Sequence, residues 1–148
     1  MTRGTRESSR KGRQLGRFER TRWVDGQWRN GDETEGDDGR YSLLVVIHDS
    51  DIAAITFSPG PPHGDCFFLG YEPADYFKDP RASLPVKRHA VASSFADWVR
   101  DATGHKVSKR AIRDLMAGPG RDPQDVFVEE TLARLLDAVG LESPAFVS

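Results

Sequence analysis

One stretch, residues 41–71, holds most of the strand-forming residues in this chain of 148 residues. Residues 43–47 form a continuous apolar run rich in β-branched side chains, which is typical of a strand covered on both faces. Residues 52–57 and 66–71 place apolar side chains at alternate positions, as half-buried strands do. Turn-forming residues separate the three runs. The stretch therefore predicts three consecutive strands with short connections, arranged as an antiparallel meander.

The segments after this stretch predict helices. Pro73 suits the first position of a short helix, and residues 86–91 could form a fourth strand at a sheet edge. Three helical patterns follow, each with a start signal and a closing glycine: from Ser94 to Gly104, from Ser108 to Gly118, and from Asp122 to Gly140. We therefore predict one α+β domain over residues 41–142, in which three C-terminal helices cover a mainly antiparallel sheet of three or four strands.

The segments before this stretch carry strong local charge. Residues 1–22 contain eight Lys or Arg and two Glu, and they are nearly devoid of apolar side chains. We therefore expect residues 1–21 to be a disordered basic tail. Residues 22–40 should form a hairpin and an acidic linker, because Asp25-Gly26 is a strong signal for a two-residue hairpin turn. That turn would place Trp23 and Trp28 across from one another or one step apart.

Composition limits the class of protein. The formal net charge is −2, which argues against a protein that coats nucleic acid through a general basic excess. The only cysteine is Cys66, so no internal disulfide can form, as suits a reducing cytoplasm. The first residues lack the apolar core of a signal peptide, and no apolar run reaches the ~18–20 residues that span a bilayer. We expect a cytoplasmic protein that does not bind membranes.

Two groups of residues are candidates for chemistry. His48, Asp49 and Asp51 could bind a metal ion or transfer protons, and Cys66 could act as a nucleophile with His63 or His48 as its base. However, Asp and Ser in a tight turn ordinarily bond their own backbone, and no motif of known mechanism surrounds either group. We therefore predict no catalytic residues, no metal site and no cofactor.

Residues 98–116 resemble a helix-turn-helix motif. Ala102, Val107, Ser108, Ile112 and Leu115 fall near the small and apolar positions of that motif. The resemblance implies a DNA-binding regulator, in which four basic side chains would face phosphates or base edges. These side chains are Lys106, Lys109, Arg110 and Arg113.

A second resemblance covers residues 41–104. Successive strands, a short aromatic segment and then the sequence ASSFADWV at residues 92–99 are similar to small bacterial immunity and adaptor proteins of toxin systems. The segment SSFADWV resembles the SMI1/KNR4-type immunity superfamily, where such a segment ends the sheet and begins the covering helix. This resemblance implies a protein without enzymatic activity that binds and neutralises a toxin or effector.

Our first functional hypothesis is accordingly a small interaction protein that binds one protein partner through acidic and aromatic surface. Acids gather at residues 32–38 and 122–130, and aromatic side chains are plentiful at protein interfaces. The alternative is the DNA-binding regulator. The residues that we predict to contact the protein partner are Trp23, Trp28, Asp37, Asp38, Tyr76, Asp125 and Glu129.

Overall fold

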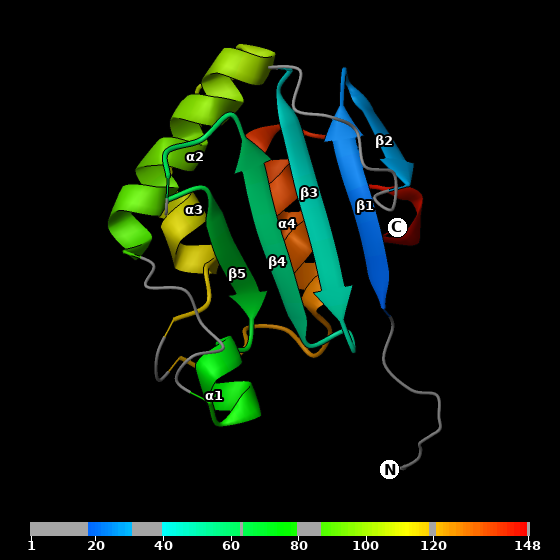
Figure 1. Cartoon of the computed structure of the whole chain (residues 1–148), viewed down its shortest axis with the longest axis vertical. Helices are drawn as coiled ribbons and strands as arrows, with labels where there is room; N and C mark the ends of the chain where they lie inside the picture. The colour runs from blue at the N-terminus through cyan, green and yellow to red at the C-terminus, as the bar shows by residue number, and fades with distance from the viewer. Residues whose placement is uncertain (1–17, 31–39, 63, 80–86, 119–120, 148) are drawn as a thin grey trace.

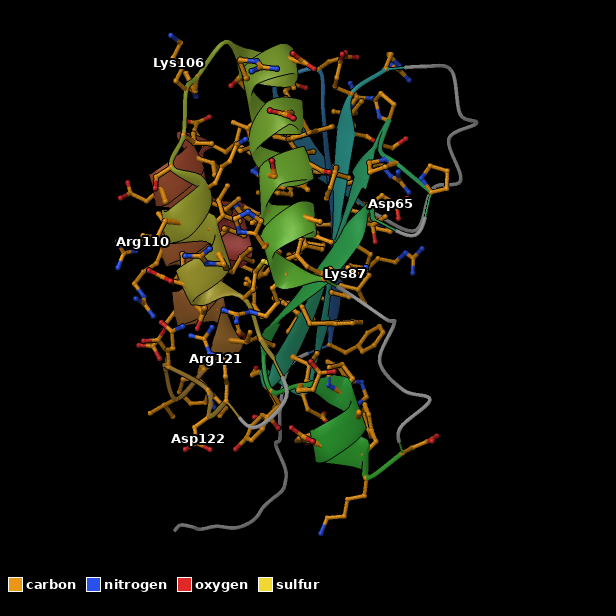
Figure 2. All side chains as sticks on the ribbon, turned by 90° about the vertical axis from the view of Figure 1, so that its left-hand side faces the viewer. Asp65, Lys87, Lys106, Arg110, Arg121 and Asp122 are labelled. Carbon is orange, nitrogen blue, oxygen red and sulfur yellow. The ribbon has the colours of Figure 1, made fainter. Side chains whose placement is uncertain are left out.

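The structure is a computed structural model that describes residues 18–30, 40–62, 64–79, 87–118 and 121–147. Its centre is a five-stranded antiparallel sheet with the strand order β2-β1-β3-β4-β5 (Figure 1). The helices α2, α3 and α4 lie on one side of this sheet (Figure 2). The fold is therefore α+β, as predicted. The elements are β1 (Glu19–Val24), β2 (Gln27–Asn30), β3 (Ser42–His48), β4 (Ile52–Ser58), β5 (Cys66–Gly70), α1 (Pro73–Phe77), α2 (Arg88–Thr103), α3 (Lys109–Leu115), α4 (Val128–Val139) and a final 3-10 turn (Ala145–Val147).

The N-terminal hairpin belongs to the sheet, which corrects the predicted number of strands. The turn at Asp25-Gly26 forms as expected, with φ values of 53° and 80°, and Trp23 pairs directly with Trp28. However, β1 also pairs with β3 along its whole length. It begins at Glu19, inside the stretch that we expected to be disordered, while residues 1–17 lie outside the described residues. The long-range pairing with β3 is what orders residues 19–21.

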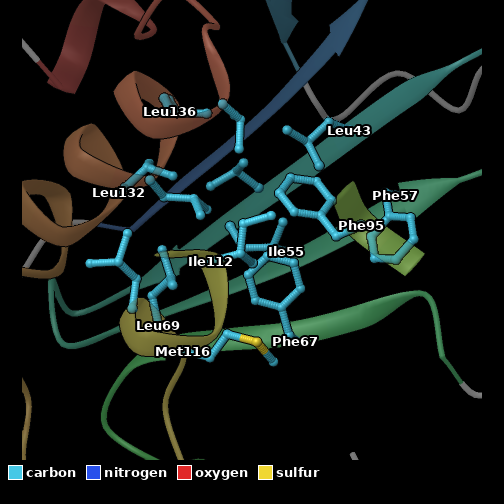
Figure 3. Packing of buried hydrophobic residues seen from close by; sticks show 14 of the residues in the cluster. Leu43, Ile55, Phe57, Phe67, Leu69, Phe95, Ile112, Met116, Leu132 and Leu136 are labelled. Carbon is cyan, nitrogen blue, oxygen red and sulfur yellow. The ribbon is translucent and has the colours of Figure 1, made fainter. Parts of the chain in front are cut away.

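The core lies between the sheet and its three covering helices. Leu43, Val45 and Ile47 of β3 share this face with their partners on β4 and are fully buried. Aromatic rings fill the centre of the interface, where the Phe57 and Phe67 centroids lie 5.2 and 5.1 Å from that of Phe95 (Figure 3). Tilted ring pairs at such distances pack favourably. The alternation in β4 and β5 is confirmed, but β3 is not covered on both faces as predicted, because Leu44 and Val46 on its other face are only half-buried.

The first covering helix is longer than predicted. The fourth strand predicted over residues 86–91 is not found among residues 88–91, which belong to α2, and residues 80–86 lie outside the described residues. Val91 and Phe95 are both buried, and they continue the helical spacing of Trp98 and Val99 toward the N-terminus. Gly104 ends the helix in a left-handed conformation, as its sequence predicted.

The other two covering helices confirm the predicted start at Ser108 and the predicted stop at Gly140, but their other ends differ from the prediction. The Ser108 hydroxyl accepts a hydrogen bond from the Ala111 N–H at 3.1 Å, but α3 ends at Leu115. The last helix stops before Gly140 as predicted and begins at Val128, not at Asp122. Its first N–H donates to the carbonyl of Ser50 at 2.8 Å. A long-range contact therefore fixes the start of α4, and a local pattern could not show it.

None of the helices in the described ranges is long and apolar enough to cross a membrane.

Candidate partner-binding surface

Exposed apolar side chains gather at one end of the sheet. At this end β1 begins, β3 turns into β4, and β5 leads into α1 (Figure 1). Among the described residues, five of the six exposed large hydrophobic side chains lie here, with exposed fractions from 39% to 81%. Exposed apolar groups that cluster in this way mark interaction sites more often than scattered ones do. We call this surface the acidic aromatic end; it comprises Phe18, His48, Asp49, Ser50, Asp51, Tyr71, Glu72, Asp75, Tyr76, Phe77, Asp122, Val126, Phe127 and Glu129.

Five rings form a continuous row across the acidic aromatic end. The row starts at Phe18, whose ring centroid lies 6.2 Å from that of His48. His48 is 5.6 Å from Phe77, which is 5.0 Å from Tyr76. Tyr76 is in turn 5.1 Å from Tyr71. Neighbouring rings limit each other's motion, so the row presents a pre-ordered apolar surface.

The turn between β3 and β4 supports this row and connects it to α4. Asp49 and Ser50 both have left-handed backbone conformations, with φ values of 53° and 57°. Ser50 is buried; its carbonyl accepts from the Val128 N–H, and its hydroxyl donates to Glu129 Oε2 at 2.9 Å. Left-handed conformations are unfavourable for residues other than glycine, and they concentrate at functional sites.

The electrostatics of this end are also unusual. Burial raises the pKa of Asp51, and the charges of Asp49 and Glu129 raise it further, although the Tyr76 hydroxyl donates to Asp51 Oδ2 at 2.8 Å and partly offsets the rise. Burial likewise raises the pKa of Glu72. In the described part of the chain, both carboxyl groups with a raised pKa lie at this one end. Perturbed pKa values cluster at functional sites, so they support a functional role for this surface.

Replacing Asp51 by Asn should stabilise the fold at pH 7, by less than about 1 kcal/mol. A carboxyl group whose folded pKa is raised binds its proton more tightly in the folded chain. The contribution of Asp51 to the free energy of unfolding, measured as the difference between the unchanged chain and the variant, should therefore fall as the pH rises from the ordinary pKa of 3.8 to the raised value, and stay level above it. The substituted amide would remain neutral and would still accept the Tyr76 hydrogen bond. Urea unfolding between pH 3 and pH 7 checks this, and a less stable variant at pH 7 would contradict it.

The structure gathers some of the predicted partner-binding residues and separates others. Tyr76 and Glu129 lie at the acidic aromatic end. Asp125 lies just before α4, where it accepts hydrogen bonds from Thr131 and Arg134, both at 2.7 Å. These two bonds lower the pKa of Asp125 and fasten the start of the helix.

Trp23 and Trp28, which we predicted to contact the partner, make contacts within the fold. Trp23 is only 8% exposed, and its ring lies 5.7 Å from that of Trp98, so it cannot contact a partner from this position. Trp28 is half-buried, and its indole N–H donates to the carbonyl of Glu142 at 2.6 Å. Asp37 and Asp38 lie outside the described residues.

Sequence reasoning missed several residues of this surface, chiefly Phe18, Phe77, Val126 and Phe127. The start of α4 in the structure shows one unusual residue choice. Phe127 occupies the position before α4, where Ser, Thr, Asp or Asn would be favoured. Its own N–H is instead bonded to the Glu130 carboxylate at 3.1 Å. Phe127 is 56% exposed at the helix start, so its ring forms part of this surface.

The catalytic candidates do not assemble into a site. His48 Nε2 lies 3.4 Å from Asp49 Oδ2, whereas Asp51 bonds Tyr76. No group of three possible ligands in the described ranges could hold a metal ion. His48 and Cys66 lie on opposite sides of β4, where they pair with Ile52 and Thr56. These two partners are about 13 Å apart along β4, so His48 is too far from Cys66 to act as its base. Burial raises the pKa of the Cys66 thiol, which disfavours the nucleophilic thiolate. His63 lies outside the described residues.

The basic residues of the helix-turn-helix interpretation lie on the helical layer. Lys106 and Arg110 point outward from it (Figure 2), and Lys109 is also exposed. Arg113 is half-buried, with Nη1 at 3.0 Å from Nδ1 of His89. The nearby Arg88 and Arg121 guanidinium groups donate to the carbonyls of Arg113 and Asp114, at 2.7 and 3.0 Å. These two arginines thus bond carbonyls at the C-terminus of α3.

No family model matches the chain, and no similar curated protein or solved structure was found.

Proposed function

We propose that this chain is a small cytoplasmic interaction module that binds one protein partner through the acidic aromatic end. The finer proposal is an immunity or adaptor protein whose partner is a toxin or effector. The observation that carries the proposal is the continuous row of five rings from Phe18 to Tyr71, in which Phe18, Phe77 and Tyr71 are exposed and which carboxylates border.

Three features support this function. Aromatic side chains held in place contribute most to protein interfaces, because little conformational entropy is lost when they bind. The left-handed turn at Asp49-Ser50 and the raised pKa of Asp51 both lower stability at the same place. Structural features that lower stability concentrate where function requires them. The acids would attract a partner with a basic surface and speed its association.

The experiment is a tagged pull-down from the native cell, with and without nuclease, followed by quantitative mass spectrometry. We expect one protein to be retained at near-equal amount in both arms. Its identity then tests the finer proposal, since an immunity protein should retain a toxin or effector. Recovery of nucleic acid, with the protein partners lost after nuclease treatment, would contradict the proposal.

The DNA-binding regulator is the second candidate, and the exposed Lys106, Lys109 and Arg110 on one side of the helical layer favour it. DNA binding through these residues should weaken steeply with salt, because each phosphate contact releases counterions. The double variant Lys109→Ala with Arg110→Ala separates the two candidates. Our proposal expects it to retain the protein partner at the level of the unchanged chain, whereas a DNA-binding regulator would lose its ligand.

A further inference from the structure

A cleft of about 360 Å³ opens beside the row of rings, between α1 and the segment before α4. Two tyrosine rings, Tyr71 and Tyr76, line it with their centroids 5.1 Å apart. Arg121 and Asp122 line the opposite side; they lie at the level of α1 in Figure 2. The remaining lining residues are Glu72 and Asp75. The cleft thus combines aromatic walls with charged groups, as ligand sites commonly do.

The charge of the lining favours a cation. Three carboxylates, from Glu72, Asp75 and Asp122, face a single guanidinium group. The guanidinium group of Arg121 is directed partly away from the three carboxylates, because its Nη2 donates to the carbonyl of Asp114 at 3.0 Å. Glu72 is only 8% exposed as a whole residue, and its carboxylate at the cleft would gain from a bound positive charge. Burial also raises its pKa, although the Ala74 N–H partly offsets the rise.

The shape of the lining favours an extended organic cation over a metal ion. The acids of the described residues nowhere converge closely enough to hold a metal ion. Tyrosine rings beside carboxylates suit a planar guanidinium group, which stacks on aromatic rings and forms paired hydrogen bonds with a carboxylate. An ammonium group would gain the charge attraction but not the stacking or the paired bonds.

We propose that this cleft binds the guanidinium group of an arginine side chain, carried by the protein partner and anchored on Glu72 beside Tyr71 and Tyr76. The inference rests on the proposed function, since it names the chemistry by which the acidic aromatic end would recognise its partner. It also accounts for two adjacent features at once: exposed rings for the apolar part of an interface, and a charged cleft that fixes its register.

The test is a nuclear magnetic resonance titration of the ¹⁵N-labelled full chain with N-acetyl-arginine amide. Its neutral analogue, N-acetyl-citrulline amide, has nearly the same shape and serves as the matched probe. We expect saturable shifts at residues 71–76 and 121–122, with arginine binding at least about tenfold more tightly than citrulline, because a charged hydrogen bond is lost in the analogue. N-acetyl-lysine amide should bind more weakly than arginine.

Two substitutions should change this affinity in opposite directions. Glu72→Gln keeps the shape of the side chain but removes its charge, and it should weaken arginine binding by about tenfold. Arg121→Gln removes the competing positive charge and should strengthen binding about threefold. Asp97→Asn, at an exposed site on α2, is the matched control and should leave the affinity unchanged. If Glu72→Gln fails to fold, Asp122→Asn takes its place.

Equal shifts with both probes, or an unchanged affinity in Glu72→Gln, would overturn the inference. These outcomes are separate from failure of the proposed function. If the cleft does not bind arginine while the chain still retains a protein partner, only the proposed arginine site is refuted. A cleft that binds arginine while no partner is retained would refute only the interaction module.

Discussion

Gly70→Ala is expected to destabilise the fold by about 3 kcal/mol, the sum of backbone strain and overpacking. Gly70 ends β5 with a φ of +84°, a conformation that residues with a Cβ rarely adopt. A Cβ at this position would lie 2.1 Å from the carbonyl oxygen of Asp51 and 3.0 Å from Cγ2 of Val128. The first of these atoms belongs to the backbone, so the clash cannot be relieved by a side-chain rotation. Urea unfolding at constant pH measures the change in free energy.

Gly104→Ala is the matched control for this prediction. Gly104 has a φ of +83°, yet a Cβ there would meet no atom within 4 Å. The control therefore carries the backbone strain alone and should lose about 1 kcal/mol. Equal losses in the two variants would show that the close approach at Gly70 has no energetic weight.

Gly70 matters for the proposed binding surface because three elements meet there. The Tyr71 N–H donates to the Asp51 carbonyl at 3.1 Å, which fastens the start of the α1 segment to the β3–β4 turn. The same turn binds the first N–H of α4 through Ser50. The acidic aromatic end is thus built on a close backbone contact that only glycine permits. Its surface geometry should be lost together with that contact.

Local patterns predicted the parts of the fold that depend on local physics. Alternating apolar residues in β4 and β5, the Ser108 cap and the glycine stops at Gly104 and Gly140 all arise within a few residues of chain, and the structure confirms them. The Asp25-Gly26 turn belongs to the same class, because both residues need left-handed conformations that their types tolerate.

The features that escaped prediction depend on contacts far apart in the chain. β1 is polar at Arg20 and Arg22, and it is held by long-range contacts, namely its pairing with β3 and the packing of Trp23 on Trp98. α4 starts where the Val128 N–H bonds the carbonyl of Ser50, a residue 78 positions earlier in the chain (128 − 50). The acidic aromatic end also depends on residues that are far apart in the chain. Its rings come from the chain before β1, from the end of β3, from the link between β5 and α1, and from α1, so no short window of sequence contains the row.

A second large effect is expected at the exposed rings of the acidic aromatic end. Phe77→Ala and Phe127→Ala should each reduce retention of the protein partner by about 30-fold, the effect of removing a central interface residue worth about 2 kcal/mol. The two side chains are 50% and 56% exposed, so each variant should keep its free energy of unfolding within about 1 kcal/mol. Retention is measured as moles of partner per mole of tagged chain in the nuclease-treated pull-down, beside an unfolding curve for each variant.

Tyr41→Ala provides the control for this prediction. Tyr41 is 37% exposed and precedes β3, at the end of that strand opposite to His48. Its ring lies 6.3 Å from that of Trp98, far from the row. Our proposal requires this variant to retain the partner fully. A loss in Tyr41→Ala equal to that in Phe77→Ala would place the interface elsewhere. Full retention by both phenylalanine variants would mean that the exposed rings do not bind the partner at all.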